Sequence, residues 1–391
     1  MGLARSSIAA AVLAVMCLAP LASAQTSPIA QHYRAYVAAL ERGDLATAAS
    51  EAQAALDASQ ARDGDGGRTA VLAFNLANVH FQAGRYAEAR PLAERALALA
   101  QAGARGVDPA AAQFVIARST LALDGEGRAG RDAAVALNAL LTSPSAESLA
   151  AEDLYGAAAE LGNWGLAHDD FDLAQSAWAL AGAHAEGSPF GEAFGLGRAR
   201  TSEGIAAVIA ELRRNRLIDE DEGHDAHALL SEAVRVLLPL ARQEAPTLEL
   251  TVAQQTYAEA TAWMSALESK LAADGRRVPE TPAEAQGDGD GFSEVGPVDL
   301  TRPRCMMRII ANPLPSYPSN SQVGSVVVFF RIGAGGEIVS GRVAARAGTE
   351  QFAEAVERVI GRWRFERVAE SPANCRMESN VLQTVRFVMP D

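Results

Sequence analysis

The spacing of hydrophobic residues changes once along this chain of 391 residues, and this change constrains the fold more than any other feature. Between Ile29 and Asp274, apolar residues recur every three or four positions, which is typical of amphipathic helices. From Gly324 the period changes to two, so that Val326 and Val328 share one face of a β-strand. The sequence therefore predicts an α+β protein, in which an all-α body is followed by a small domain that contains a sheet.

The first 24 residues have the features of a secretory signal peptide. A positive charge at Arg5 precedes the apolar run Ile8–Leu18, and small residues at Ala22 and Ala24 mark a cleavage site. We therefore expect removal of residues 1–24 and export of the mature chain. An uncleaved leader that anchors the protein in the inner membrane is the alternative.

A short motif recurs in the helical body, residues 25–274. Gly43–Ala48 resembles Gly84–Ala89, and Asp170–Ala174 has the same order of a turn residue, a large apolar residue and alanine. The small residues that close the copies are Ala48, Ala89, Ala133 and Ala174. Because alanine lets two helices approach closely, the motif resembles the turn and second helix of the tetratricopeptide repeat. The resemblance implies a curved stack of helical hairpins whose concave face holds a partner; an armadillo-like array, a spacer and a dimerisation body are the alternatives.

Composition changes again after the helical body. Residues 275–300 contain glycines, prolines and acidic residues, which predicts a flexible acidic linker. The whole chain has a net charge of −14, whereas residues 301–391 carry 12 arginines and 8 acidic residues, a charge of +4. The acidic balance argues against binding of nucleic acid, which requires clustered Lys and Arg.

The C-terminal region, residues 301–391, predicts the element order ββαβ. Gly324–Ile332 is a strand, Gly333–Gly336 a tight turn and Glu337–Ala345 the returning strand. Thr349 is placed to cap a helix, and 381–388 forms the final strand. The apolar stripe of the helix comprises Phe352, Ala355, Val356 and Val359. These elements predict a helix packed on one face of a small sheet.

Several motifs of this region together resemble the C-terminal domain of the TonB family, over about residues 313–390. The residues that carry the resemblance are Tyr317, Pro318, Gly324, Phe352, Trp363 and Phe365. We expect these residues to be structural, with Trp363 as a core anchor. The resemblance implies a periplasmic domain that binds the N-terminal segment of an outer-membrane transporter as an added strand. The short helix usual between Pro318 and Gly324 is missing from the sequence, which departs from the family pattern.

The last strand is the expected acceptor of such a segment, because terminal strands often lie at sheet edges. The predicted partner-binding residues are Val381, Leu382, Gln383, Thr384, Val385, Arg386, Phe387 and Val388. Arg386 is expected to face solvent and to attract an acidic peptide. The acidic body or the linker could compete for the same surface.

Two cysteines, Cys305 and Cys375, remain after removal of the leader, and both lie in the C-terminal region. In an oxidising compartment such a pair predicts a disulfide, with two buried free thiols as the alternative. The bond would close a loop of about 70 residues and stabilise the fold by roughly 4 kcal/mol in the chain-entropy treatment.

Three local patterns suggest chemistry but fail as sites. His224 and His227 have a spacing that two metal ligands can use, yet no third ligand follows. Residues 288–299 do not complete a calcium loop, and residues 168–170 coincide with a repeat turn. We therefore expect no catalytic residue, metal or cofactor and interpret the chain as a non-enzymatic binding or adaptor protein. A membrane-anchored energy transducer for outer-membrane receptors and an exported enzyme with a docking tail are the alternatives.

Overall fold

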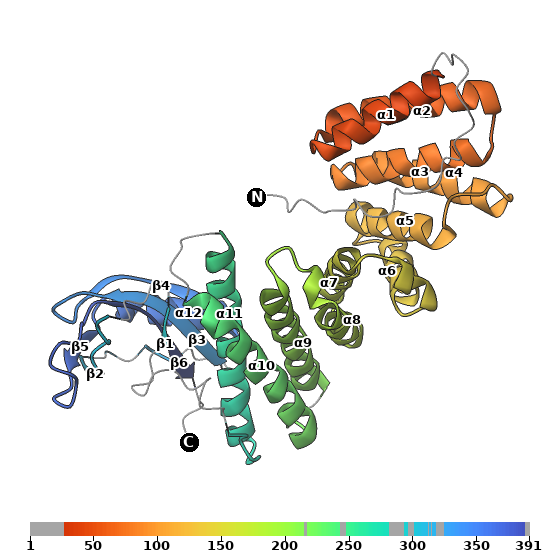
Figure 1. Cartoon of the computed structure of the whole chain (residues 1–391). Coiled ribbons are helices and arrows are strands. Elements are labelled where there is room, and N and C mark those ends of the chain that lie inside the picture. The colour runs from red at the N-terminus through yellow and green to blue at the C-terminus, as the bar shows by residue number, and fades with distance from the viewer. Residues whose placement is uncertain are drawn as a thin grey trace. The chain divides into compact units, whose positions relative to one another are not determined.

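A computed structural model confirms the predicted fold class, with a helical-hairpin region followed by a small antiparallel sheet (Figure 1). The structure describes residues 27–214, 217–242, 248–280, 293–295, 301–311, 313, 315–317 and 324–387. The predicted signal peptide, most of the predicted linker, Pro318 and Val388 lie outside the described residues, as does the segment that would hold the missing short helix.

The chain forms two compact units, which divide between Trp164 and Gly165. The boundary lies inside α7 (Ala151–Ala167), because residues on each side of it contact mainly residues of their own unit. The predicted domains, residues 25–274, 275–300 and 301–391, follow composition instead, and their boundaries stay a prediction.

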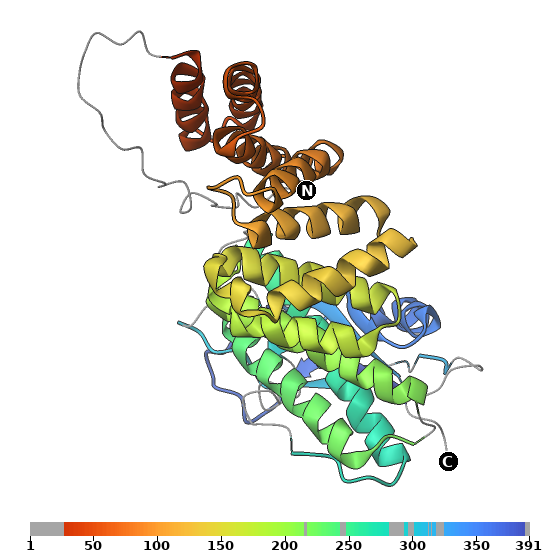
Figure 2. The same ribbon diagram turned by 90° about the vertical axis from the view of Figure 1, so that its right-hand side faces the viewer.

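The first unit consists of helices that contact their neighbours in chain order (Figures 1 and 2). They are α1 (Pro28–Glu41), α2 (Leu45–Asp63), α3 (Gly67–Gln82), α4 (Tyr86–Gln101), α5 (Pro109–Asp124), α6 (Arg128–Leu141), the 3-10 turn Pro144–Ser148 and the start of α7 (Ala151–Ala167). Their shared surfaces contain many fully buried alanines, such as Ala70, Ala77 and Ala93. Small side chains let these helices approach closely, which explains the alanine content of the sequence.

The recurring motif is the turn before the second helix of a hairpin. Gly43 and Gly84 have positive φ angles of 69° and 70°, and Asp169 takes the same conformation in the third copy, with a φ of 60°. The next helix begins two residues later in each copy, at Leu45, Tyr86 and Phe171. The closing residues Ala48, Ala89, Ala133 and Ala174 are all buried. The interpretation of residues 168–170 as a turn is therefore confirmed.

The second unit contains the helices that follow α7 and the sheet. The helices are α8 (Phe171–Ala183), α9 (Glu192–Arg214), α10 (Glu220–Ala241) and α11 (Leu248–Ala273), and a 3-10 turn (Ala185–Gly187) separates α8 from α9. The strands are β1 (Ser293–Glu294), β2 (Met307–Ala311), β3 (Gly324–Ile332), β4 (Ile338–Ala347), β5 (Arg364–Arg367) and β6 (Ser379–Phe387), with α12 (Glu350–Ile360) between β4 and β5. The main sheet has the order β1-β6-β3-β4, and β2 pairs with β5.

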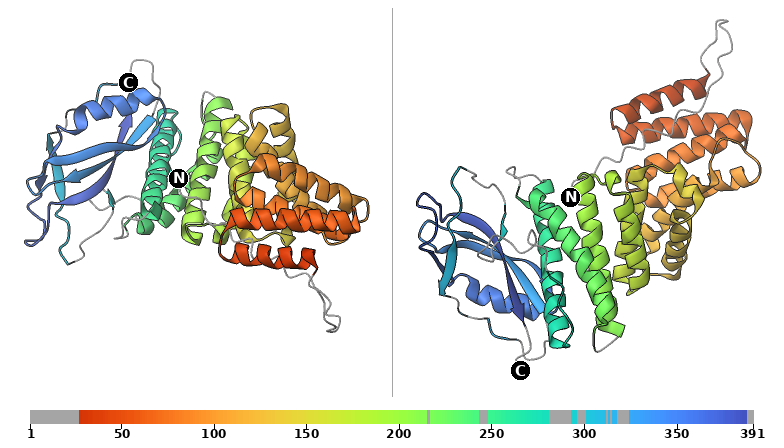
Figure 3. Two further views of the ribbon diagram at one scale, coloured as in Figure 1. Left: turned by 90° about the horizontal axis from the view of Figure 1, so that it is seen from above. Right: turned by 60° about the horizontal axis from the view of Figure 1, so that its bottom comes forward.

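Both faces of the main sheet are covered, by α12 on one side and α11 on the other (Figure 3). Val326, Val328 and Phe330 belong to the core that includes α12, whereas Val327 and Leu382 belong to the core that includes α11. Gln255 of α11 also donates a hydrogen bond to Ala344 O at 2.7 Å, and Ser325 Oγ donates one to Ala262 O. Only the face covered by α12 was expected from the sequence. The unbroken apolar run from 326 to 330 is the signal for burial on both faces.

The described motif residues of the C-terminal region pack against one another. Trp363 is buried, and its ring lies edge-on to Phe330 at 5.9 Å, while Phe365 stacks on Phe330 at 5.5 Å. The ring of Tyr317 lies 6.2 Å from that of Phe352. A Cβ added at Gly324 would lie 2.3 Å from the Phe352 ring, so only glycine fits at this position.

The predicted disulfide between Cys305 and Cys375 is present, with the two Cα atoms 4.9 Å apart. It connects the segment before β2 to the loop before β6. Cys305 N also donates to Arg376 O at 2.9 Å, and Arg376 N donates to Pro303 O at 3.0 Å. The covalent bond and these main-chain bonds hold two distant segments side by side.

Candidate protein-binding edge

The predicted acceptor strand, β6, has one fully paired side and one partly paired side. It pairs with β3 over its whole length, from Ser379 to Phe387. On the opposite side it pairs with β1 only at Val381 and Leu382. In the described part of the chain, no other strand follows this side from Gln383 to Phe387. This side of β6 is therefore paired at Val381 and Leu382, and its role as an acceptor stays a prediction.

The register shows which main-chain groups face the open side. Val295 N donates to Asn380 O at 2.9 Å, so Asn380 points toward β1. Successive residues of a strand direct their N–H and C=O groups to opposite sides. Because β6 has no register shift against β3, the groups of Thr384 and Arg386 also face the open side.

Two polar groups at this edge are only partly satisfied. Thr384 O accepts a hydrogen bond at 2.9 Å from the side chain of its neighbour Gln383. Gln383 Oε1 is buried and has no hydrogen-bond partner within the described residues. Because buried polar atoms are nearly always paired, this atom marks a place where a further donor would be favourable.

The side chains of β6 alternate between the two cores of the unit. Val381, Val385 and Phe387 face the α12 core, and Leu382 faces the α11 core. These residues offer a partner their main chain rather than their side chains. Arg386 is exposed, as expected, but its charge is paired, because its Nη2 donates to Glu268 Oε2 at 2.6 Å.

Strand β1 comes from the predicted linker. The carboxylate of Glu294 accepts from Arg376 Nη1 at 2.6 Å, and both side chains are at most 10% exposed. Arg242 Nε of the segment after α10 donates to Glu294 O at 3.1 Å. Val295 is fully buried among residues of α10, α11 and the sheet. Residues 293–295 are therefore a bound strand, which corrects the expectation of a flexible linker at these three positions.

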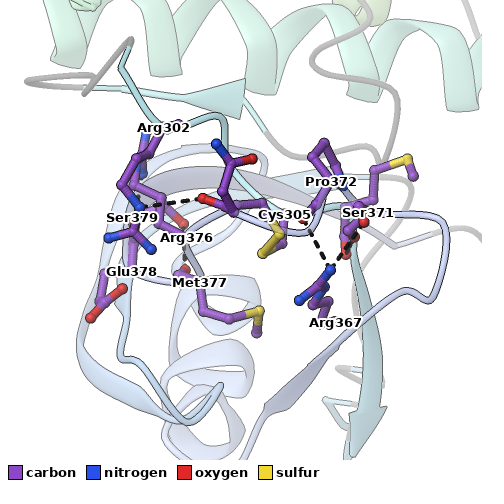
Figure 4. The surroundings of a disulfide bond; sticks show 12 residues. Arg302, Cys305, Arg367, Ser371, Pro372, Arg376, Met377, Glu378 and Ser379 are labelled. Carbon is purple, nitrogen blue, oxygen red and sulfur yellow. Dashed lines mark hydrogen bonds between the residues drawn. A yellow bond between two sulfur atoms is a disulfide. The ribbon is translucent and has the colours of Figure 1, made fainter.

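Arg376 is fixed beside the disulfide (Figure 4). Its Nε donates to Arg302 O at 3.2 Å, and its Nη1 also donates to Glu378 O at 2.6 Å. Its Nη2 is buried and has no hydrogen-bond partner in the described residues. The guanidinium group thus still has a donor available for a second oxygen.

A buried polar network joins α10, α11 and β6. His227 Nε2 lies 3.1 Å from Glu268 Oε1, and Ser231 Oγ lies 3.3 Å from His227 Nδ1. The order resembles a serine–histidine–carboxylate triad, but all three side chains are buried, so a substrate cannot reach the serine hydroxyl. We therefore assign the network a structural role, since it links Arg386 of the sheet to two helices.

The candidate metal pair His224 and His227 is not brought together. His224 Nε2 lies 2.8 Å from Arg277 O, whereas His227 contacts Glu268. Among the described residues, no three His, Cys, Asp or Glu side chains are grouped to hold a metal ion.

The helices of the first unit gather a second polar cluster around Arg118 of α5. Arg118 hydrogen bonds to both carboxylate oxygens of Glu160, at 2.8 and 2.6 Å, and lies over the rings of Phe81 and Phe114. Burial alone would lower the pKa of Arg118, but the hydrogen bond and charge of Glu160 and the charge of Asp153 raise it. Sequence analysis missed this cluster, because its members lie on three separate helices.

The described residues contain no helix that is long and apolar enough to cross a membrane. The search of curated proteins found no match to the chain. A family model described as tetratricopeptide repeat matches residues 27–102, which include α1 to α4. The match confirms the resemblance for these four helices and supports a role in protein–protein interaction.

Proposed function

We propose that the chain is an exported, non-enzymatic adaptor that binds a partner protein in the periplasm by adding an extended segment of the partner to the edge of β6. The tetratricopeptide match supports protein binding in general. The leader-like first 24 residues and the disulfide are both typical of exported proteins.

The proposal that the partner binds at the edge of β6 rests on one observation. The side of β6 that faces β1 has no strand partner from Gln383 to Phe387 within the described residues, and Gln383 Oε1 is buried there without a donor. An added strand would supply main-chain donors and acceptors along these five residues. The two covered faces hold the strand rigidly in place for such pairing.

The resemblance of residues 313–390 to the TonB family supports one class of partner, the N-terminal segment of an outer-membrane transporter. The protein would then act in outer-membrane transport, and the helical repeats would offer a second surface for the partner or for another protein.

A comparison of two substitutions at Thr384 tests the proposal. Thr384→Pro removes an N–H that faces the open side and places the proline ring in the path of an added strand, while the ladder to β3 stays intact. Thr384→Val keeps the main chain and serves as the matched control. Each full-length variant is used to capture proteins from periplasmic and outer-membrane extracts of the native host, with quantification by mass spectrometry.

We expect at least one protein that the parent and Thr384→Val capture equally and that Thr384→Pro captures about tenfold less, because a main-chain hydrogen bond and strand access are lost. Circular-dichroism melts confirm that all three proteins are folded. Equal capture by the three folded proteins would show that the edge of β6 is not the acceptor.

A further inference from the structure

The outer side of β6 already holds a short strand of the same chain, and its contacts describe the ligand that this edge accepts. Ser293 lies opposite Leu382 and Glu294 opposite Val381, in antiparallel order. The contact combines main-chain pairing, a buried ion pair to Arg376 and a fully buried Val295. These three features are typical of complexes in which a peptide binds as an added strand.

We propose that residues 293–295 are a built-in ligand that the partner displaces, and that the partner segment is an extended peptide with a carboxylate for Arg376 followed by a small aliphatic residue. This inference rests on the proposed function, since it specifies what the edge of β6 binds.

The chemistry of Arg376 favours such an exchange. Glu294 contacts Nη1, whereas Nη2 is buried without a partner in the described residues. A guanidinium group binds both oxygens of a carboxylate when these face its two parallel N–H groups. A partner carboxylate placed in this way would also satisfy Nη2, which has no hydrogen-bond partner in the described residues.

The register indicates where the rest of the partner lies. Because β1 runs antiparallel to β6, the residues that precede the carboxylate continue opposite Gln383 to Phe387. The sequence before Ser293 contains the run Asp-Gly-Asp-Gly at positions 288–291, which has very low β-strand propensity. A partner with β-branched residues before its carboxylate would pair its main chain with Thr384 and Arg386 and so compete with residues 293–295.

Peptide binding to two charge variants tests the inference. The probe is a fluorescent peptide, Thr-Val-Thr-Val-Thr-Ser-Glu-Val-Gly, which keeps the sequence of residues 293–296 and provides a strand-forming N-terminal half. Its control peptide has Gln in place of Glu. The full chain is compared with Glu294→Arg, in which the internal segment repels Arg376, and with Glu280→Arg, a charge reversal at an exposed position of the same segment.

We expect Glu294→Arg to bind the probe about tenfold or more tightly than the parent and Glu280→Arg, because the competing segment no longer occupies the edge. The Gln peptide should bind Glu294→Arg about tenfold more weakly than the probe, because it lacks the charge that pairs with Arg376. Anisotropy titrations measure both effects, and circular dichroism confirms folding.

The contrary outcomes separate the two proposals. If the probe binds the parent and Glu294→Arg with equal, measurable affinity, the internal segment is not displaced. If the two peptides bind with equal affinity, the carboxylate is not recognised. In both cases β6 would remain an acceptor. Absence of any binding to folded Glu294→Arg would overturn the proposed function itself.

Discussion

The helical hairpins of the first unit and the sheet of the second unit are stabilised by contacts of different range. Between α1 and α6, each helix contacts the next one along the chain, and the turns repeat one conformation at Gly43 and Gly84. The sheet instead joins residues far apart in sequence, such as Gln255 with Ala344 and Glu268 with Arg386, 89 and 118 positions apart. The first unit therefore depends on local turn chemistry, and the second depends on a few long-range connections.

Removal of the disulfide should give the largest effect and should act on the second unit and not on the first. The bond joins residues 70 positions apart, so its loss returns roughly 4 kcal/mol of chain entropy to the unfolded state in the loop-closure treatment. We expect Cys305→Ser/Cys375→Ser to lower the stability of the sheet by about this amount, measured by near-UV circular dichroism in urea. The helical signal of α1–α6 should stay unchanged. An unchanged transition of the sheet would show that long-range covalent closure does not determine its stability.

The repeat turn offers a smaller effect confined to the first unit. Gly84 has a φ of 70°, and a Cβ added there meets nothing within 4 Å, so Gly84→Ala adds backbone strain without a collision. We expect a loss of about 1–2 kcal/mol, the cost of the left-handed conformation for an L-residue.

Gly361→Ala is the matched control, because this residue has a φ of −63° and the same free space. Its effect should be neutral or stabilising by about 0.4–1 kcal/mol, since alanine reduces the entropy of the unfolded chain. Urea titrations of both variants make the comparison. If the two substitutions have the same effect, turn conformation does not control the stability of the hairpins.

The smallest effect concerns the charge of Asp153 in the cluster around Arg118. Burial raises the pKa of Asp153, and the charge of Arg118 opposes this only in part. Because its folded-state pKa lies above the unfolded value, the ionised carboxylate disfavours the folded state at neutral pH, and this penalty disappears as the pH falls below about 4.

Asp153→Asn should therefore raise the stability of the first unit at pH 7 by less than about 1 kcal/mol, with a difference that vanishes in acid. Thermal melts from pH 3 to 7 follow this difference, about the range over which an aspartate titrates. A less stable variant at pH 7 would show that attraction to Arg118 outweighs the cost of burial.

The difference between local and long-range contacts also explains which elements could be predicted from the sequence. The repeat turns, the β3–β4 hairpin and α12 depend on neighbouring residues, and their positions agree with the predicted ones to within a few residues. The strands β1, β2 and β5 are short, and each pairs with a strand from a distant part of the chain. Such pairing leaves no periodic pattern in a strand of two to five residues.

For the candidate site, the sequence predicted the strand β6 but not the segment that pairs with it. Strand β6 was expected from the alternation of Val381, Val385 and Phe387, and its proposed role as an acceptor rests on the resemblance to the TonB family. The sequence indicated only that the acidic body or the linker could compete for this strand, and it did not indicate that residues 293–295 bind there. The ion pair of Glu294 with Arg376 joins residues 82 positions apart, so no local pattern indicated it.

Amide hydrogen exchange resolved to single residues of β6 tests the central claim most directly. The full chain with Glu294→Arg is measured with and without the peptide Thr-Val-Thr-Val-Thr-Ser-Glu-Val-Gly. Without peptide, the amides of Gln383 and Val385, which face β3, should be protected, while those of Thr384 and Arg386 should exchange rapidly. Bound peptide should slow exchange at Thr384 and Arg386 and leave Gln383 and Val385 unchanged. Unaltered exchange at Thr384 and Arg386 under saturating peptide would contradict strand addition at this edge.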